Sequence, residues 1–170
     1  MKDGQVGVCS RNLELKLEDE NNAYVRTATN SGLINALQRY SEAGAPFGDI
    51  AVQGELMGPG VQGNREGLNE LRIFVFDIWS IQEQEYFMPA RRMALFNELC
   101  TTYEADIDHV PILAVFRPIH ETSVDELIGL ADMTPSLNHK QAEGLVFKPH
   151  AHDLQSFKVI SNKFLLKEKD

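Results

Sequence analysis

Cysteine is scarce in this sequence of 170 residues, and the two that occur, Cys9 and Cys100, lie far apart. They form no CxxC motif and no Cys/His spacing, so the sequence predicts neither a structural zinc site nor a disulfide framework. No stretch approaches the roughly 18 apolar residues that a membrane span requires. The polar residues 1–5 are unlike a signal peptide. We therefore expect a cytoplasmic protein without membrane contact.

Positive charge is also scarce. Sixteen Lys and Arg residues face 25 Asp and Glu residues, for a net charge of −9. This balance argues against a protein that binds nucleic acid non-specifically along its length, because affinity for phosphate backbones comes from clustered Lys and Arg. Five of the basic residues nevertheless lie in the last part of the chain: Lys148, Lys158, Lys163, Lys167 and Lys169. This local group of basic residues is typical of an enzyme that binds one triphosphate or one strand end, although a solvated tail explains the last two lysines equally well.

Hydrophobic periodicity predicts an α+β fold in a single domain over residues 1–170. Alternating or continuous apolar runs predict strands at 5–10, 50–56, 71–79, 86–88, 110–115, 145–147 and 156–160. Helical spacing predicts helices at 21–40 (interrupted at 30–32), 89–103 and 124–131, the last with a capping box from Ser123 and Glu126. We expect two mostly antiparallel sheets with flanking helices, and a ligand site in a cleft between the sheets.

Five segments place charged residues in or beside apolar strands. A core rejects unpaired charges, so such residues commonly face a cleft, although a single one is more often merely structural or solvated. The segments are Cys9-Ser10-Arg11-Asn12, Gln53-Gly54-Glu55-Leu56, Phe74-Val75-Phe76-Asp77-Ile78, Glu143-Gly144-Leu145-Val146-Phe147-Lys148 and Ser156-Phe157-Lys158-Val159-Ile160.

Taken together and in this order, the five segments resemble the collinear motifs of the covalent nucleotidyltransferases, which include DNA ligases, RNA ligases and mRNA capping enzymes. The wider strings Gly-Glu-Leu-Met-Gly-Pro-Gly-Val-Gln-Gly-Asn and Glu-Gly-Leu-Val-Phe-Lys are similar to the Deinococcus-type branch of the ATP-dependent RNA ligases. The resemblance runs from about residue 5 to residue 168. It implies a nucleotidyltransferase fold of the ATP-grasp-like ligase type, ATP (bound as AMP in the intermediate) as cofactor, and RNA 5′-phosphate and 3′-OH ends as partners.

The resemblance assigns nucleotide-binding roles to three residues in the first half of the chain. Arg11 would contact the nucleotide sugar or the 5′-phosphate end, and otherwise forms a surface salt bridge. Glu55 would accept hydrogen bonds from ribose hydroxyls. Phe76 would stack on adenine, although a phenylalanine in so apolar a strand can equally belong to the core.

It assigns phosphate and metal chemistry to residues in the second half. Glu143 would help to hold Mg²⁺ or Mn²⁺ near the α-phosphate, since hard cations prefer carboxylate oxygen. Lys148 could reach phosphate, and Lys158 would stabilise charge on the α-phosphate as pyrophosphate leaves. Glu143 and Lys158 are thus the predicted catalytic pair. Many relatives carry a second lysine where this chain has Ile160, and Lys163 is a possible substitute.

The family's nucleophile is the first lysine of Lys-x-Asp/His-Gly, whose amine attacks the α-phosphate and forms lysyl-AMP. This chain has only Met1-Lys2-Asp3-Gly4, in which Met1 takes the lysine's place. Because Gly4 lies seven residues before Arg11, we interpret Asp3-Gly4 as a turn and disfavour Lys2 as a relocated nucleophile. The sequence therefore predicts an N-terminally truncated domain that lacks motif I and an upstream OB-type domain, and that does not adenylylate itself.

Two alternatives remain open: an inactive homologue that binds nucleotide or RNA ends, and a DNA ligase or capping-type transferase. The Gly58–Arg65 segment lacks the Gly-Lys-Ser/Thr ending of a phosphate loop, so we expect a turn at the border of the nucleotide cleft. His150 and His152 could form a metal pair, but in a polar loop they are more simply exposed.

Overall fold

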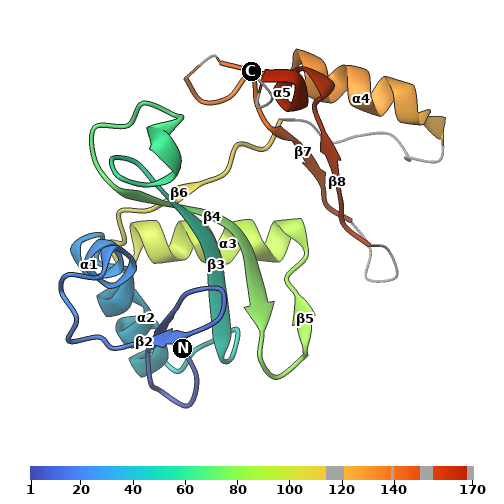
Figure 1. Cartoon of the computed structure of the whole chain (residues 1–170). Helices are drawn as coiled ribbons and strands as arrows, with labels where there is room; N and C mark the ends of the chain where they lie inside the picture. The colour runs from blue at the N-terminus through green and yellow to red at the C-terminus, as the bar shows by residue number, and fades with distance from the viewer. Residues whose placement is uncertain (114–120, 139, 150–154, 168–170) are drawn as a thin grey trace. The chain divides into compact units, whose positions relative to one another are not determined.

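A computed structural model describes residues 1–113, 121–138, 140–149 and 155–167 of the chain (Figure 1). The chain divides into two compact units, Met1–Val110 and Pro111–Asp170.

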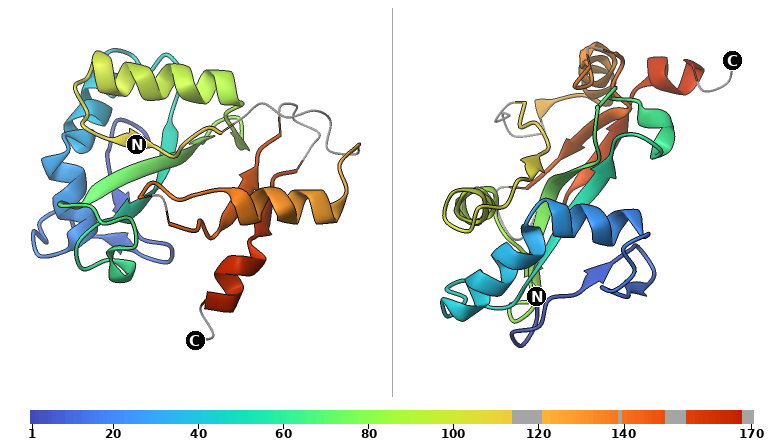
Figure 2. Two further views of the ribbon diagram at one scale, coloured as in Figure 1. Left: turned by 90° about the horizontal axis from the view of Figure 1, so that it is seen from above. Right: turned by 90° about the vertical axis from the view of Figure 1, so that its left-hand side faces the viewer.

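The first unit, Met1–Val110, is built around a sheet of four strands. Its elements are β1 (Val8–Cys9), β2 (Glu14–Leu15), α1 (Ala23–Asn30), α2 (Leu33–Glu42), β3 (Ile50–Met57), a 3₁₀ turn (Gln62–Asn64), β4 (Arg72–Ser80), β5 (Glu85–Tyr86), α3 (Pro89–Thr101) and β6 (Asp108–His109). The central strand β4 pairs antiparallel with β3 and β5 and parallel with β6, while β1 and β2 form a separate hairpin. The strands and helices of this unit can be followed from two further directions in Figure 2.

One hydrophobic core holds this unit together. Helices α2 and α3 bury their apolar faces against β3 and β4, so that helix and sheet share one packed interior. The fully buried members are Ala36, Tyr40, Ile50, Val75, Ile78, Leu95 and Leu99. Helices α1 and α2 are separated by Gly32, which adopts a φ of 72° that glycine tolerates without strain.

Tyr40 is the buried polar member of this core. Its hydroxyl donates to the carbonyl of Gly48 (3.1 Å) and accepts from the amide of Phe47 (2.9 Å). Burial is the main reason that the pKa of Tyr40 rises to about 12, since the charged phenolate would be desolvated. The loop before β3 is therefore fastened to α2.

The second unit, Pro111–Asp170, contains a helix pair and a hairpin. Its elements are α4 (Val124–Met133), β7 (Gly144–Phe147), β8 (Phe157–Ile160) and α5 (Asn162–Lys167). Strands β7 and β8 pair antiparallel, with Val146 opposite Lys158. Ser123 and Glu126 form the predicted capping box at the start of α4.

The long elements match the sequence predictions to within a few residues. The α+β class is confirmed, with mostly antiparallel strands; among the described residues these form three sheets, where the sequence predicted two. The strand expected at 110–115 was wrong: the strand lies at Asp108–His109, residues 110–113 are not in a strand, and 114–115 lie outside the described residues. None of the helices in the described ranges has the length and apolarity needed to cross a membrane.

Candidate functional site

Arg11 lies in the tight turn that joins β1 to β2, and it is exposed to solvent. The turn is closed by the amide of Ser10, which donates to the carbonyl of Leu13 (2.8 Å), and by hydrogen bonds of the Ser10 hydroxyl. Strand β2 was not among the strands predicted from the sequence. The guanidinium of Arg11 is thus presented at the tip of a short, locally fastened hairpin.

The strand pair β3–β4 carries a β-bulge at Phe76. Asp77 pairs with Gln53, whereas the next pair joins Val75 to Gly54, so Phe76 is the extra residue on β4. A bulge of this kind redirects a side chain and sharpens the local twist. Phe76 is half-buried, which fits a ring that packs partly against the protein and partly faces solvent.

Gly54 faces this bulge from the neighbouring strand. A Cβ atom at position 54 would lie 3.0 Å from the carbonyl oxygen of Phe74 and 3.1 Å from a methyl group of Ile73. The adjacent Glu55 is exposed and pairs with Phe74, two residues from Phe76. The predicted ribose-binding carboxylate and the predicted adenine-stacking ring therefore lie on adjacent strands within a few residues of one another.

The loop after β3 contains the turn that the sequence predicted, and its backbone is strained at two residues. Gln62 and Asn64 have φ values of 44° and 48°, a region that side chains rarely adopt and that is over-represented at functional sites. The Asn64 side chain fastens the loop through two hydrogen bonds with the backbone of Leu68 (2.8 and 3.0 Å). The Gln62 amide lies 3.5 Å from the Glu55 carboxylate, so this loop borders the predicted ribose contact.

A buried ion pair lies directly behind the bulge, and the sequence analysis missed it. Asp77 and Arg92 are each 5% exposed, and Nη1 of Arg92 lies 3.3 Å from Oδ1 of Asp77. Burial lowers the pKa of Arg92, and the carboxylate of Asp77 opposes that shift. The signal in the sequence was the spacing: Arg92 shares one face of α3 with the buried Leu95 and Leu99.

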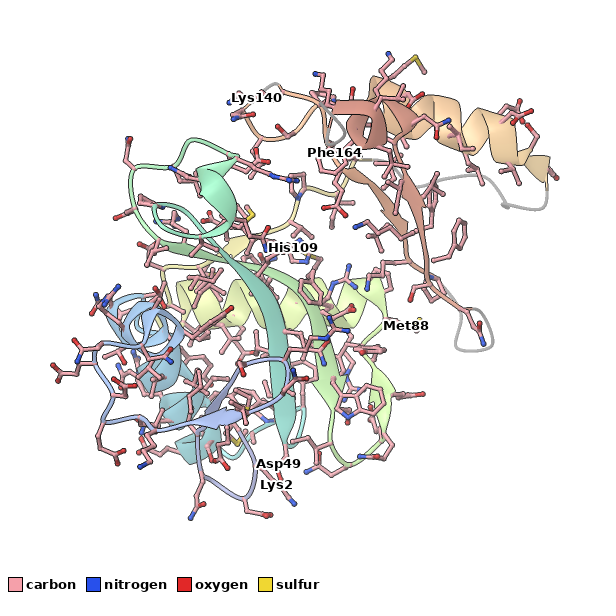
Figure 3. The ribbon with its side chains drawn as sticks, viewed as in Figure 1. Lys2, Asp49, Met88, His109, Lys140 and Phe164 are labelled. Atoms are coloured by element: carbon pink, nitrogen blue, oxygen red, sulfur yellow. The ribbon has the colours of Figure 1, made fainter. Side chains whose placement is uncertain are left out.

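His109 on β6 is part of the same polar cluster, and Figure 3 labels it together with Met88, the residue before α3. Its Nδ1 lies 2.6 Å from the carbonyl of Val110, and its ring packs edge-on against Phe96 of α3. Burial lowers the pKa of His109, Arg92 adds to that shift, and the Val110 hydrogen bond and the charge of Asp77 oppose it. The lowered pKa favours the neutral imidazole, and because a carbonyl oxygen can only accept a hydrogen bond, the contact with Val110 requires the proton on Nδ1.

In the second unit, the β7–β8 hairpin joins Glu143 and Lys158 in an ion pair, although they lie 15 residues apart in the sequence. Both side chains remain about half exposed, 50% for Glu143 and 45% for Lys158. The amide of Ser161 donates to the carbonyl of Glu143 (2.9 Å), which extends the strand pairing to the residue that carries the carboxylate. The two residues predicted to be catalytic are thus brought together in a site that a ligand can reach.

Gly144 permits this close strand pairing. A Cβ atom on Gly144 would lie 2.1 Å from the carbonyl oxygen of Val159, far inside van der Waals contact. Glycine at position 144 is therefore a steric requirement of the hairpin.

Helix α5 follows β8 immediately and was not predicted. The Asp132 carboxylate accepts hydrogen bonds from the Ser161 hydroxyl (2.7 Å) and the Lys163 amide (3.2 Å), and these bonds lower the pKa of Asp132. Lys163 is exposed in the first turn of α5, and Ile160 is exposed on β8. Lys148 is half-buried at the end of β7, whereas His150 and His152 lie outside the described residues.

Near the N-terminus, Asp3 and Gly4 form a turn, as predicted, with φ values of 49° and 75°. Lys2 and Gln5 pair across this turn, and the amide of Asp3 donates to the Asp49 carboxylate (3.1 Å). Lys2 is exposed, and Figure 3 shows it beside Asp49.

The six predicted site residues divide between the two units. The first unit holds Arg11, Glu55 and Phe76, and the second holds Glu143, Lys148 and Lys158. Glu55 pairs with Phe74, two residues from Phe76, and Glu143 contacts Lys158. A single pocket lined by Arg11, Glu55, Phe76, Glu143 and Lys158 stays a prediction.

The predicted metal ligand is the carboxylate of Glu143. Within the described ranges, no three His, Cys, Asp or Glu side chains converge as metal ligands would. Glu143 offers one exposed carboxylate, which fits Mg²⁺ because this ion usually keeps several waters and takes one or two carboxylates together with substrate phosphates.

Comparison with known proteins gives a consistent result. A family model described as RNA ligase matches residues 1–160. The structure of Naegleria gruberi RNA ligase with PPi has a TM-score of 0.88 and 36% sequence identity, and covers 100% of this chain and 47% of that chain. Variants of the same ligase with ATP and Mn (TM-score 0.87, 35% identity) and with AMP and Mn (TM-score 0.83, 35% identity) also cover 100% of this chain and 47% of those chains.

No protein of curated function matches the sequence significantly. The chain spans less than half the length of the Naegleria ligase, but the family model covers nearly all of it. The chain therefore belongs to the RNA ligase family.

Proposed function

We propose that this chain is the nucleotidyltransferase domain of an ATP-dependent RNA ligase, and that it binds ATP, a divalent cation and RNA ends. The observation that carries the proposal is the exposed Glu143–Lys158 ion pair on the β7–β8 hairpin. An ammonium and a carboxylate held side by side offer one group for a phosphate and one for the cation that accompanies it. The Naegleria ligase, which is similar over the whole chain, has been solved with ATP and Mn.

In this proposal the residues of the second unit handle the phosphates. In the complete family protein the Lys158 ammonium would stabilise the negative charge on the α-phosphate as pyrophosphate leaves, and in the sealing of pre-adenylated RNA it would stabilise the charge on the phosphate of the departing AMP. Glu143 supplies a carboxylate oxygen for Mg²⁺ or Mn²⁺, whose charge would neutralise the phosphates. Lys148 adds a second cation for the phosphate chain.

The residues of the first unit bind the nucleoside and the strand end. Phe76, redirected by the bulge, stacks on adenine, a contact worth about 1–3 kcal/mol. Glu55 accepts hydrogen bonds from the ribose hydroxyls, and Arg11 contacts the sugar or the 5′-phosphate end. RNA ligation by the complete family protein joins a 3′-OH to a 5′-phosphate through lysyl-AMP and RNA-adenylate.

Residues 1–170 contain no Lys-x-Asp/His-Gly, because Met1 stands where the lysine would be. We therefore propose that this polypeptide binds ATP without forming lysyl-AMP. Binding without self-adenylylation is also what an inactive homologue would show, and this is the second candidate function. The two versions differ in whether the chain seals RNA that has been adenylated beforehand.

Three assays on the same protein test the proposal. Calorimetry should detect ATP binding, incubation with α-³²P-labelled ATP should leave the protein unlabelled, and a pre-adenylated RNA should be sealed in the presence of Mg²⁺. Labelled protein would overturn the proposed lack of lysyl-AMP formation, and absence of ATP binding would overturn the proposed site. Binding without sealing would select the inactive homologue, and sealing of adenylated DNA in preference to RNA would favour a DNA ligase.

The variants Glu143→Ala and Lys158→Ala should each reduce sealing at least 100-fold, on the order of the loss seen when one transition-state contact is removed. Lys167→Ala is the matched control, because Lys167 is an exposed lysine in the last turn of α5. Wild-type sealing in either of the first two variants would show that the pair has no part in the reaction.

A further inference from the structure

The Asp77–Arg92 pair is a costly feature that the proposed chemistry does not use. Both residues are 5% exposed, and the Nε atom of Arg92 is buried without a hydrogen-bond partner. Buried ion pairs are weak contributors to stability, since the cost of desolvating two charges often exceeds their attraction. A role in holding a particular local geometry would account for the presence of this pair better than a role in stability.

The local geometry that the pair would hold is the bulge of β4. Asp77 immediately follows Phe76, the extra residue of the bulge, and regular pairing with β3 resumes at Asp77 and Gln53. A one-residue change in strand register transfers side chains to the opposite face of a sheet. Fixing Asp77 therefore fixes the direction in which the Phe76 ring points.

Arg92 is itself held rigidly. It lies in the first turn of α3, where Pro89 pre-sets the backbone and the amide of Arg92 donates to the carbonyl of Met88 (2.9 Å). Leu95 and Leu99, on the same face of the helix, are 0% exposed. The guanidinium thus links the residue after the bulge to a helix whose apolar face is buried in the core of the unit.

We propose that Arg92, acting through Asp77, is a positioning residue that sets the Phe76 ring for recognition of the adenine base. This inference rests on the proposed function, because it assumes that Phe76 contacts adenine. It makes a specific claim about binding energy: loss of the pair weakens the part of ATP affinity that comes from the base and leaves the part that comes from the phosphates.

The test compares ATP with inorganic tripolyphosphate, which carries the phosphates without the base, by calorimetry on the whole chain. The main variant is Asp77→Leu with Arg92→Met, since apolar residues of similar volume commonly replace a buried ion pair without loss of stability. Loss of a base-stacking contact corresponds to roughly a 5- to 150-fold weaker Kd. We expect a loss in that range for ATP and less than about a 2-fold change for tripolyphosphate.

A second comparison asks whether the pair acts through Phe76. Phe76→Ala alone should weaken ATP binding to a similar extent, and adding the Asp77→Leu and Arg92→Met changes should weaken it little further. Additive losses would show that the pair acts elsewhere and would overturn the inference. Arg92→Lys, which keeps the charge but not the planar guanidinium, provides a second variant and should give an intermediate ATP affinity.

Arg72→Gln is the matched control. Arg72 begins the same strand and forms ion pairs with Glu70, Asp106 and Asp108, but it lies four residues before Phe76. It should leave the ratio of ATP to tripolyphosphate affinity unchanged. An equal fall in both affinities in the Asp77→Leu/Arg92→Met chain would mean that the pair is merely structural.

The outcomes separate this inference from the proposed function. If the wild-type chain binds ATP in a Phe76-dependent way and the Asp77→Leu/Arg92→Met chain keeps full ATP affinity, the inference alone fails. If the wild-type chain binds ATP no more tightly than tripolyphosphate, the adenine site itself is wrong, and the proposed function loses its nucleoside contact together with this inference.

Discussion

The two units of the chain bury apolar surface to very different degrees. Met1–Val110 has a continuous core to which α2, α3, β3 and β4 all contribute. Within the described part of Pro111–Asp170, the buried apolar residues are few: Leu127, Ala131 and Phe147. Exposed apolar side chains are instead frequent there, among them Val146, Phe157 and Ile160 on the β7–β8 hairpin.

This contrast coincides with a division of the proposed roles. The residues assigned to the base and the sugar, Phe76 and Glu55, lie on the well-packed sheet. Those assigned to the phosphates, Glu143 and Lys158, lie on a two-stranded hairpin. Hairpins of two strands are marginally stable on their own, and segments with few buried contacts open more readily. Selectivity for the nucleoside is thus assigned to the rigid unit, and phosphate chemistry to the one that opens more easily.

The largest expected effect is the loss of stability when a core leucine is truncated, and this loss should differ between the two units. Leu99 of α3 is 0% exposed and Leu127 of α4 is 8% exposed. Leu99→Ala should lower the free energy of unfolding by about 2–5 kcal/mol, because it leaves a cavity in a closely packed core. Leu127→Ala should cost less, since fewer buried neighbours surround it. Chemical denaturation followed by circular dichroism measures both, and equal losses would contradict the contrast.

The hairpin itself can be opened by a single methyl group. In Gly144→Ala the new Cβ meets the carbonyl oxygen of Val159, so β7 and β8 must separate at a cost of about 1–3 kcal/mol. Hydrogen exchange should accelerate at the β8 amides while those of β3 and β4 stay protected. Gly129→Ala is the control, because no atom lies within 4 Å of the added Cβ and alanine in a helix interior should stabilise α4 by about 0.5–1 kcal/mol. Unchanged exchange at β8 in Gly144→Ala would refute the steric requirement.

The smallest expected effect is the pH dependence of the first unit. The pKa of His109 is lowered in the native chain, chiefly by burial, whereas in the unfolded chain it takes its ordinary value of about 6.5. The unfolded state therefore binds more protons between these two values, and the free energy of unfolding falls as the pH drops below about 6.5. His109→Gln removes this titration, so the variant should lose less stability than the wild type between pH 7 and pH 5. Identical pH profiles in urea denaturation would show that His109 does not titrate as proposed.

Much of the fold could be predicted because its long elements have strong periodicity. The apolar run of β4 and the spacing of α3 were clear in the sequence. The two-residue strands β2 and β6 were not, since two residues carry no periodic pattern and their pairing depends on the partner strand. Helix α5 was missed because it owes its start to Asp132, about 30 residues earlier in the chain.

The sequence supplied only the identities of the candidate site residues, and their roles stay predictions. The resemblance of the ordered motifs singled out Glu143 and Lys158, and hairpin pairing explains why these two side chains meet. The bulge at Phe76 and the partner of Asp77 could not be predicted. Both depend on the register between strands and on which helix covers the sheet, and local sequence does not encode either. Arg92 would have been recognised only by asking why a charge shares the apolar face of α3.

The mutual pairing of Glu143 and Lys158 has a consequence for selectivity. Two opposite charges in contact largely cancel at a distance, so this spot attracts a bare polyanion weakly, all the more so on a chain of net charge −9. A metal–nucleotide complex carries both a cation and phosphates, so it can contact the Glu143 carboxylate and the Lys158 ammonium at the same time. The single contact between these two side chains is then replaced by two contacts with the ligand. We therefore expect the chain to bind metal-complexed nucleotide more tightly than free nucleotide. The reason is that Glu143 and Lys158 neutralise each other, and not that positive charge is concentrated at this spot.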